Sequence, residues 1–128
     1  MKKTLLATVA LSALLALPGA TKADGGLVVS ATHSGGSCFA FAIGDPNYVV
    51  SYFGINLNPV NSDGTPNNQF SAAVWANTVV AYANAGKPIW FDVSTTQTVT
   101  CRGDIAGVAG PMQFPAVANI NSVRGPGQ

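Results

Sequence analysis

Few side chains in this sequence could carry out acid–base or nucleophilic chemistry. His33 is the only histidine, and there is no glutamate. Ser34 and Ser37 lie close to His33, but neither stands in the Gly-x-Ser-x-Gly turn that presents the nucleophile of many hydrolases. The aspartates occur mostly in turn contexts such as Asp63-Gly64, which gives no pair of carboxylates for glycosidic cleavage. We therefore predict that the protein is not an enzyme, and His33 is the one residue on which a small hydrolase could be built.

No metal ion or nucleotide cofactor is expected. Two cysteines and one histidine are too few for a usual zinc site. The sequence also lacks a phosphate-binding glycine loop, a dinucleotide fingerprint and a calcium-binding loop. The tripeptide Arg102-Gly103-Asp104 matches the adhesion motif of integrin ligands, but a turn explains three such residues equally well. Its role stays open.

Amides and aromatic rings offer the main binding chemistry of the sequence. Sugars stack their apolar faces on aromatic rings, while amides and hydroxyls meet their hydroxyl groups. The same aromatic residues can instead fill the core. The residues that we select as candidates for glycan binding are Asn47, Tyr48, Tyr52, Asn68 and Trp90.

The N-terminal residues have the order of a secretory signal peptide. Two lysines precede an uncharged apolar run over residues 4–17, and small residues follow it. The run is shorter than the roughly 18 to 20 apolar residues of a membrane-spanning helix. A peptidase site with Thr21 and Ala23 at its small positions predicts that residues 1–23 are removed. Cleavage after Ala20 is the second choice.

The mature chain, residues 24–128, would then reach the periplasm or the outside of the cell with few charges. Lys87, Arg102 and Arg124 stand against five aspartates, which is a net charge of −2. Nucleic acids and anionic membranes require a basic stripe. We therefore exclude nucleic acid as a partner and expect no membrane insertion.

Cys38 and Cys101 are the only cysteines. An even pair in an exported chain predicts a disulfide. Closing a loop of this length would stabilise the fold by roughly 4 kcal/mol in the chain-entropy model.

Periodicity predicts one mostly-β domain with a central helix. Large and small residues alternate over residues 38–43, whereas residues 70–85 show a spacing of three and four and carry no formal charge. Gly86 supplies a left-handed cap for this helix, and Pro88 prevents its continuation. Strands are expected over residues 27–32, 38–43, 48–57, 89–93, 98–101 and 105–109, a long loop over 58–69, and a flexible C-terminal tail over about 112–128.

The uncharged helix is expected to be buried on more than one side, either in the core or in a subunit contact. Trp75, Val79 and Tyr82 are its candidate residues for an oligomer contact. Three strands, a long loop, a helix and further strands are the order of a small Greek-key barrel of the OB-fold type. The fold class is therefore α+β, mostly β, with an OB-fold-like barrel.

Three short motifs in the domain are shared with a known family. Residues 26–35 form a strand that ends in His-Ser-Gly and leads to Cys38-Phe39. The helix from Trp75 ends in a Gly-Lys-Pro step over residues 85–89, and Ile105-Ala106-Gly107-Val108 follows later. Together these motifs resemble the B subunits of bacterial toxins, namely subtilase cytotoxin and its pertussis-like and typhoid-toxin relatives.

The resemblance implies a non-catalytic subunit that forms a homo-oligomeric ring, pentameric in those toxins, and binds cell-surface glycans next to a catalytic A subunit. Many of these glycans are sialylated and are held by a serine at the start of the first strand. Here that position falls near Gly25, so the sialic-acid preference does not carry over. The second disulfide of several relatives is also missing.

We therefore expect a secreted or periplasmic, oligomeric, glycan-binding subunit that resembles a toxin B subunit. The alternative is a small periplasmic structural or inhibitory protein that binds another protein, as a monomer or a heterocomplex. The identity of the glycan and the existence of an A subunit stay open.

Overall fold

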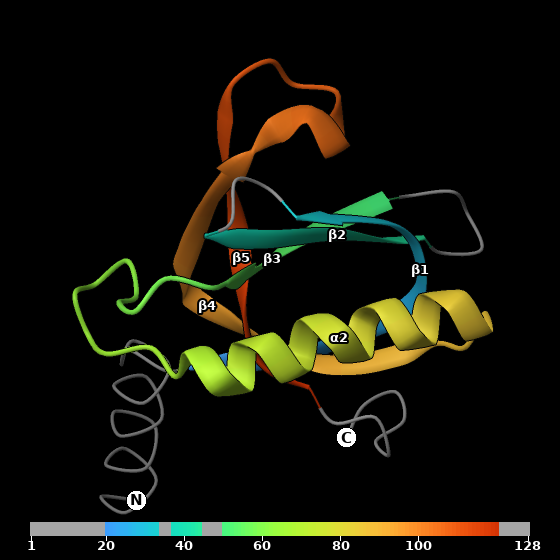
Figure 1. The fold of residues 1–128 in the computed structure, drawn as a ribbon, viewed down its shortest axis with the longest axis horizontal. Coiled ribbons are helices and arrows are strands. Elements are labelled where there is room, and N and C mark those ends of the chain that lie inside the picture. The colour runs from blue at the N-terminus through green and yellow to red at the C-terminus, as the bar shows by residue number, and fades with distance from the viewer. Residues whose placement is uncertain (1–19, 34–36, 45–49, 121–128) are drawn as a thin grey trace, which may run out of the picture.

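The structure, a computed structural model, describes residues 20–33, 37–44 and 50–120, and these form a closed five-stranded sheet with one α-helix (Figure 1). The strands pair in the order β1-β2-β3-β5-β4, and β1 also pairs with β4. This mostly-β fold confirms the predicted OB-fold-like Greek-key barrel. The elements are β1 (Thr21–His33), β2 (Cys38–Gly44), β3 (Val50–Asn56), α2 (Gln69–Ala85), β4 (Ile89–Arg102), the 3-10 helix η1 (Gly103–Ala106) and β5 (Pro111–Ile120).

Strand β2 is buried along almost its whole length because it faces two hydrophobic clusters. The large residues of its alternating pattern, Phe39, Phe41 and Ile43, enter the larger cluster. The small residue Ala40 faces the second cluster together with Cys38. The alternation read from the sequence therefore separates two cores, and the predicted hairpin with β1 is present from Leu27↔Gly44 to His33↔Phe39.

The larger cluster lies between the sheet and α2. Phe91 on β4 packs edge-to-face against Phe41 and Phe53, with ring centroids 5.3 and 5.0 Å apart. From α2, the cluster receives Ala72, Ala76 and Val79, each no more than 4% exposed.

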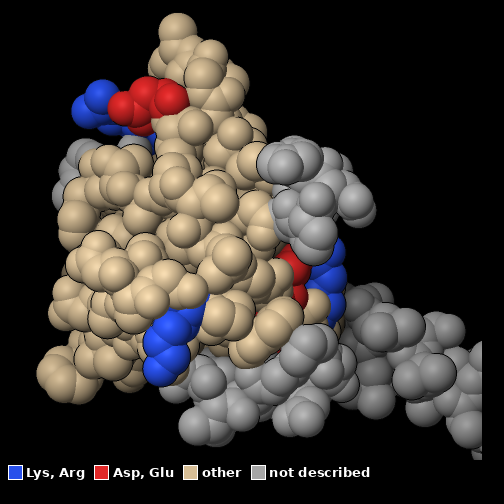
Figure 2. Space-filling view, turned by 90° about the vertical axis from the view of Figure 1, so that its right-hand side faces the viewer, with Lys and Arg blue, Asp and Glu red and all other residues tan. Residues whose placement is uncertain are grey.

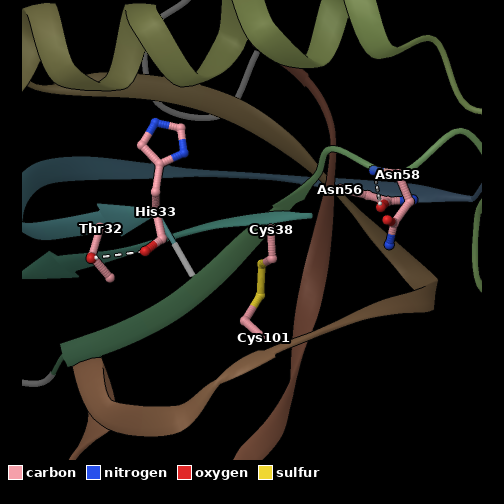
Figure 3. The surroundings of a disulfide bond; sticks show 6 residues. All are labelled: Thr32, His33, Cys38, Asn56, Asn58 and Cys101. Carbon is pink, nitrogen blue, oxygen red and sulfur yellow. Dashed lines mark hydrogen bonds between the residues drawn. A yellow bond between two sulfur atoms is a disulfide. The ribbon is translucent and has the colours of Figure 1, made fainter. Parts of the chain in front are cut away.

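The second cluster surrounds the predicted disulfide. Cys38 on β2 and Cys101 on β4 are bonded, with their Cα atoms 5.5 Å apart, and both are buried (Figure 3). Val99 and Phe114 complete this cluster. A buried disulfide is compatible with folding in an oxidising, exported compartment.

Helix α2 runs along one end of the sheet, opposite the turn between β4 and β5 (Figure 1). Asn68 caps its N-terminus by accepting a hydrogen bond from the Ser71 backbone N–H, and Gly86 ends it with a φ of 66°. Both ends agree with the predicted helix within one residue. Among the residues that the structure describes, no helix is both long and apolar enough to cross a bilayer.

Within the chain itself, one side of α2 is buried, and burial of a second side in a subunit contact stays a prediction. The opposite side is exposed and uncharged, and Phe70 on it is 80% exposed. We call it the outer face of α2. Its residues are Phe70, Ala73, Val74, Asn77, Val80, Ala81 and Asn84.

The predicted end of the fold needs correction. Residues 105–109 are not a strand, because η1 and a turn at Gly107, with a φ of 75°, fold the chain back on itself. The strand β5 instead covers residues 111–120, most of which fall in the predicted flexible tail. Phe114 and Val117 on β5 are buried in the two clusters. Residues 121–128 lie outside the described residues.

The two predicted strands at 89–93 and 98–101 are the arms of one bent strand, β4. Its first arm pairs with β1 on one edge and with the end of β5 on the other, and its second arm pairs with the start of β5. The register with β5 shifts between Val93 and Thr98, so residues 94–97 form the bend.

The first strand starts earlier than predicted. Thr21 pairs with Ser94, and Ala23 pairs with Asp92, within the segment assigned to the leader. Residues 1–19 of that leader lie outside the described residues.

Candidate functional site

The connection from β3 to α2 is held by side-chain amides rather than by a core. Asn56, at the end of β3, donates to the Val60 carbonyl at 2.8 Å and accepts from the Asn58 backbone N–H at 2.9 Å. Asn67 donates to the carbonyls of Asn56 and Asn58 at 2.8 and 2.7 Å. Because these bonds satisfy backbone groups along the connection, a segment with little apolar surface takes a defined shape. Figure 3 shows Asn56 and Asn58 where this connection leaves β3.

The tip of the connection is a small turn around Asp63. Asn61 donates to the Thr65 hydroxyl at 3.1 Å and to the Pro66 carbonyl at 3.2 Å. Asp63 accepts from the backbone N–H of Thr65 at 3.0 Å and from its hydroxyl at 2.5 Å. These hydrogen bonds from Thr65 lower the pKa of the Asp63 carboxyl below its ordinary value of 3.8, so the turn carries a negative charge at neutral pH.

The bend of β4 faces this turn. The Ser94 hydroxyl accepts hydrogen bonds from the backbone N–H groups of Thr96 and Gln97 at 3.2 and 2.9 Å, which fixes the bend. The Gln97 amide then donates to the Asp63 carboxylate at 3.3 Å. The bend and the β3–α2 connection are thereby joined.

An open cleft of about 190 Å³ lies between the connection, α2, β4 and β5. None of the described residues that line it carries a formal charge. We call it the amide cleft. It is lined by Thr21, Asn56, Asn61, Asn67, Trp75, Ser94, Gln97 and Ala116–Ala118.

Trp75 supplies the aromatic wall of the amide cleft. It projects from α2, lines the cleft and also packs against the larger hydrophobic cluster. An indole held in this way loses little freedom when a ligand stacks on it. Thr21 also lines the cleft, but it belongs to the predicted leader, so in the mature chain the other residues would form the cleft.

The asparagine side chains of the amide cleft offer a ligand acceptors rather than donors, whereas the Gln97 amide keeps a second N–H. The Nδ2 groups of Asn56, Asn61 and Asn67 each already donate to two protein oxygens. In the described part of the chain, no protein donor meets the Oδ1 atom of Asn67 or the Oε1 atom of Gln97. Each of these oxygens can accept a hydrogen bond from a ligand hydroxyl.

A second hollow of about 220 Å³ lies on the other side of the Asn56–Asn61 pair. Its polar lining includes Asn58, Ser62, Thr98 and Thr100. The amide-rich surface therefore extends past the amide cleft along the second arm of β4.

The structure does not bring the described glycan-binding candidates together. Tyr52 packs edge-to-face with Phe114 at 6.3 Å, Asn68 caps α2, and Trp90 lies across Gly25 on the neighbouring strand. Asn47 and Tyr48 lie outside the described residues. None of the three described candidates lines the amide cleft.

The three helix residues selected for an oligomer contact all face the protein itself. Val79 is fully buried, and Trp75 and Tyr82 pack against the larger cluster. Lys87 lies 5.7 Å from the centre of the Tyr82 ring. Trp75 stays open to the amide cleft, and the exposed residues of α2 that another chain could pack against are those of its outer face.

His33 and the adhesion-like tripeptide both contact neighbouring residues of the fold. The His33 ring packs edge-to-face on Phe39 at 5.0 Å. Arg102 and Asp104 of the adhesion-like tripeptide pair with each other at 3.1 Å at the start of η1. Within the described segments, no group of three or more His, Cys, Asp or Glu residues could hold a metal ion.

The polar residues of the amide cleft are not among the glycan-binding candidates predicted from the sequence: Asn56, Asn61, Asn67, Ser94 and Gln97. Asn56, Asn58 and Asn67 belong to the same amide-rich segment as the candidates, so local composition indicates this wall. Gln97 comes from the bend of β4, which no local pattern marks. Compared with known proteins, the chain matches no family model, no curated protein and no solved structure.

Proposed function

We propose that the protein is an exported, non-catalytic glycan-binding subunit and that the amide cleft holds a sugar. One observation carries this proposal: an uncharged cleft combines the Trp75 indole with amide oxygens that lack a protein donor. Sugars present both an apolar ring face and hydroxyl donors, so such a cleft offers a partner for each. The resemblance to toxin B subunits supports the same assignment, with a cell-surface glycan as ligand and an A subunit as a further partner.

The size of the amide cleft fits a small ligand. Its volume of about 190 Å³ lies below the roughly 300 to 1,000 Å³ of pockets that take drug-sized molecules. A single sugar ring would fill the cleft, and the second hollow would receive the next unit of an oligosaccharide. Binding by one such site is weak, so an array that displays many copies of each glycan is the suitable assay.

The test uses the full chain, exported and processed by a bacterial host, on an array of neutral and acidic glycans. We expect binding that falls about tenfold or more with Trp75→Ala or Gln97→Ala, since each removes a wall of the cleft. Gln113→Ala on β5 is the matched control for glutamine, because Gln113 lies on the exposed side of β5 and does not line the cleft. No signal for any glycan would refute the proposal.

The outer face of α2 supports self-association, which is the second part of the proposal. Phe70, Val74 and Val80 are 80%, 48% and 40% exposed, and the helix has no charged residue that would keep another chain away. Charged side chains are also sparse on the side of the molecule that Figure 2 shows. Exposed apolar patches of this kind mark protein contacts.

Light scattering on the exported protein tests this part. We expect a homo-oligomer that Val74→Asp dissociates, because an aspartate in the contact would be buried without a partner. Val108→Asp is the matched control, since Val108 is 42% exposed and lies in the turn between β4 and β5. A monomeric wild-type protein would contradict self-association and favour the alternative of a module that binds a different protein through this face.

A further inference from the structure

The amide cleft offers a ligand two free amide oxygens and no charged donor among its described residues. Asn67 Oδ1 and Gln97 Oε1 have no protein donor within the described residues, whereas the asparagine Nδ2 groups are engaged. We infer that the amide cleft selects an uncharged sugar, which donates hydrogen bonds from its hydroxyls, and discriminates against sugars that carry a carboxylate. This inference rests on the proposed glycan-binding function and names the chemical class of its ligand.

A carboxylate in the cleft would lack a cation. None of the described basic residues lines the cleft. Arg102 pairs with Asp104, and Lys87 lies over Tyr82 at the end of α2. Lys22 lines a neighbouring hollow with Ser94 and Gln97, but it belongs to the predicted leader, which the mature chain lacks. The donors left to the ligand are neutral, for example the Ser94 hydroxyl. A carboxylate loses its hydration on entering a cleft, and neutral donors replace that hydration less well than a cation does.

Asp63 adds repulsion at the rim. Its carboxylate accepts from the Gln97 amide at 3.3 Å, so it lies one side chain away from the lining. The hydrogen bonds from Thr65 keep it ionised at neutral pH. A second carboxylate bound next to Gln97 would therefore meet a like charge, which is unfavourable and screened by salt.

Matched sugars test the inference directly. Methyl glucoside and methyl galactoside are compared by calorimetry with the methyl glycosides of glucuronic acid and galacturonic acid, which differ from them only by a carboxylate at carbon 6. The exported full chain is used at low and at physiological salt. We expect the neutral member of at least one pair to bind about tenfold more tightly or better, because the acid leaves a charged group unpaired.

The Asp63→Asn variant separates the two causes. We expect this variant to reduce the difference in binding affinity between the neutral and the acidic sugars at low salt. The reduction should be smaller at physiological salt. Asp104→Asn removes a charge from η1 at the far end of the sheet and should leave the difference unchanged (Figure 1).

The possible results have distinct meanings. Equal or tighter binding of the acidic sugars, or array binding restricted to sialylated glycans, would overturn this inference while the proposed function stands. Binding of no saccharide at all, on the array or in calorimetry, would refute the proposed function itself.

Discussion

The side-chain amide of Gln97 donates a 3.3 Å hydrogen bond to the carboxylate of Asp63, 34 residues away in the chain. This bond joins the bend of β4 to the tip of the β3–α2 connection. Both groups are exposed to solvent, so the bond contributes little to the stability of the whole fold. The bond instead holds the bend of β4 and the β3–α2 connection, two walls of the amide cleft, in place relative to each other.

Acid should weaken the turn around Asp63. The folded-state pKa of this carboxyl is lowered by Thr65, so the folded state binds its proton less readily than the unfolded state does. The stabilisation is therefore complete above the ordinary pKa of 3.8 and is lost as the pH falls through the lower folded value. Urea unfolding of the wild type and Asp63→Asn across this range measures the effect.

The expected result is a stability advantage of the wild type over Asp63→Asn that is constant near neutral pH and shrinks in acid. The variant serves as the reference for the wild type, because the amide at position 63 does not titrate in this range. An advantage that stays the same down to about pH 2 would contradict the assigned hydrogen bonds.

Asn68 should matter for stability rather than for sugar binding. Its side chain accepts from the Ser71 backbone N–H at 3.1 Å as the N-cap of α2. Asn68→Ala should therefore lower the free energy of unfolding by about 1 kcal/mol. Asn77→Ala, on the outer face of the same helix, is the matched control and should have a smaller effect. If Asn68→Ala abolished glycan binding without any loss of stability, Asn68 would act in binding the glycan, as the sequence predicts, rather than as a stabilising N-cap.

The disulfide should stabilise both the fold and the amide cleft. Cys38 and Cys101 are separated by 63 residues, and linking them stabilises the folded state by roughly 4 kcal/mol in the chain-entropy model. Cys38 is also the strand partner of Asn56, which begins the β3–α2 connection. We expect the free energy of unfolding of the Cys38→Ala/Cys101→Ala protein, measured by denaturant unfolding, to be lower than that of the wild type by about this amount. Unchanged stability would show that the closed sheet does not need the bond.

Local patterns are sufficient to predict β2 and α2, and the presence of just two cysteines predicts the disulfide. In β2, large and small residues alternate because each set meets its own cluster, and Gly86 ends α2 because only a left-handed residue continues the chain there. These signals depend on neighbours in the sequence. They need no knowledge of which strands pair.

Strand β5 could not be read from the sequence in the same way. Pro111 and Pro115 are typical of loops, and the buried residues Phe114 and Val117 are three apart rather than two. The spacing follows from the structure, because Phe114 serves one cluster and Val117 the other. Pro115 is tolerated because it pairs with Thr98, next to the register shift of β4.

The amide cleft could be predicted only in part for a related reason. Its asparagines occur together before α2, so composition points to them. Gln97 reaches the same cleft only because β4 bends between its two arms. The bend lies where the register between β4 and β5 shifts, and such a shift leaves no periodic signal in the residues that form it.

Closure of the sheet between β3 and β5 should depend on the absence of a side chain at Gly54. Gly54 pairs with Ala116 where the two strands meet in parallel, and it is buried. A Cβ atom there would overlap the Val99 side chain and lie 3.3 Å from the Cys101 sulfur. Gly54→Ala should therefore lower the free energy of unfolding by about 1 to 3 kcal/mol.

A double-mutant cycle with Val99→Ala identifies the cause. If the overlap with Val99 is responsible, the two substitutions together should cost less than the sum of their separate effects, by about 0.5 kcal/mol or more. Denaturant unfolding of the four proteins gives this coupling. Additive effects would mean that the cost of an alanine at position 54 comes from the backbone of β3 rather than from the crowded contact between β3 and β4.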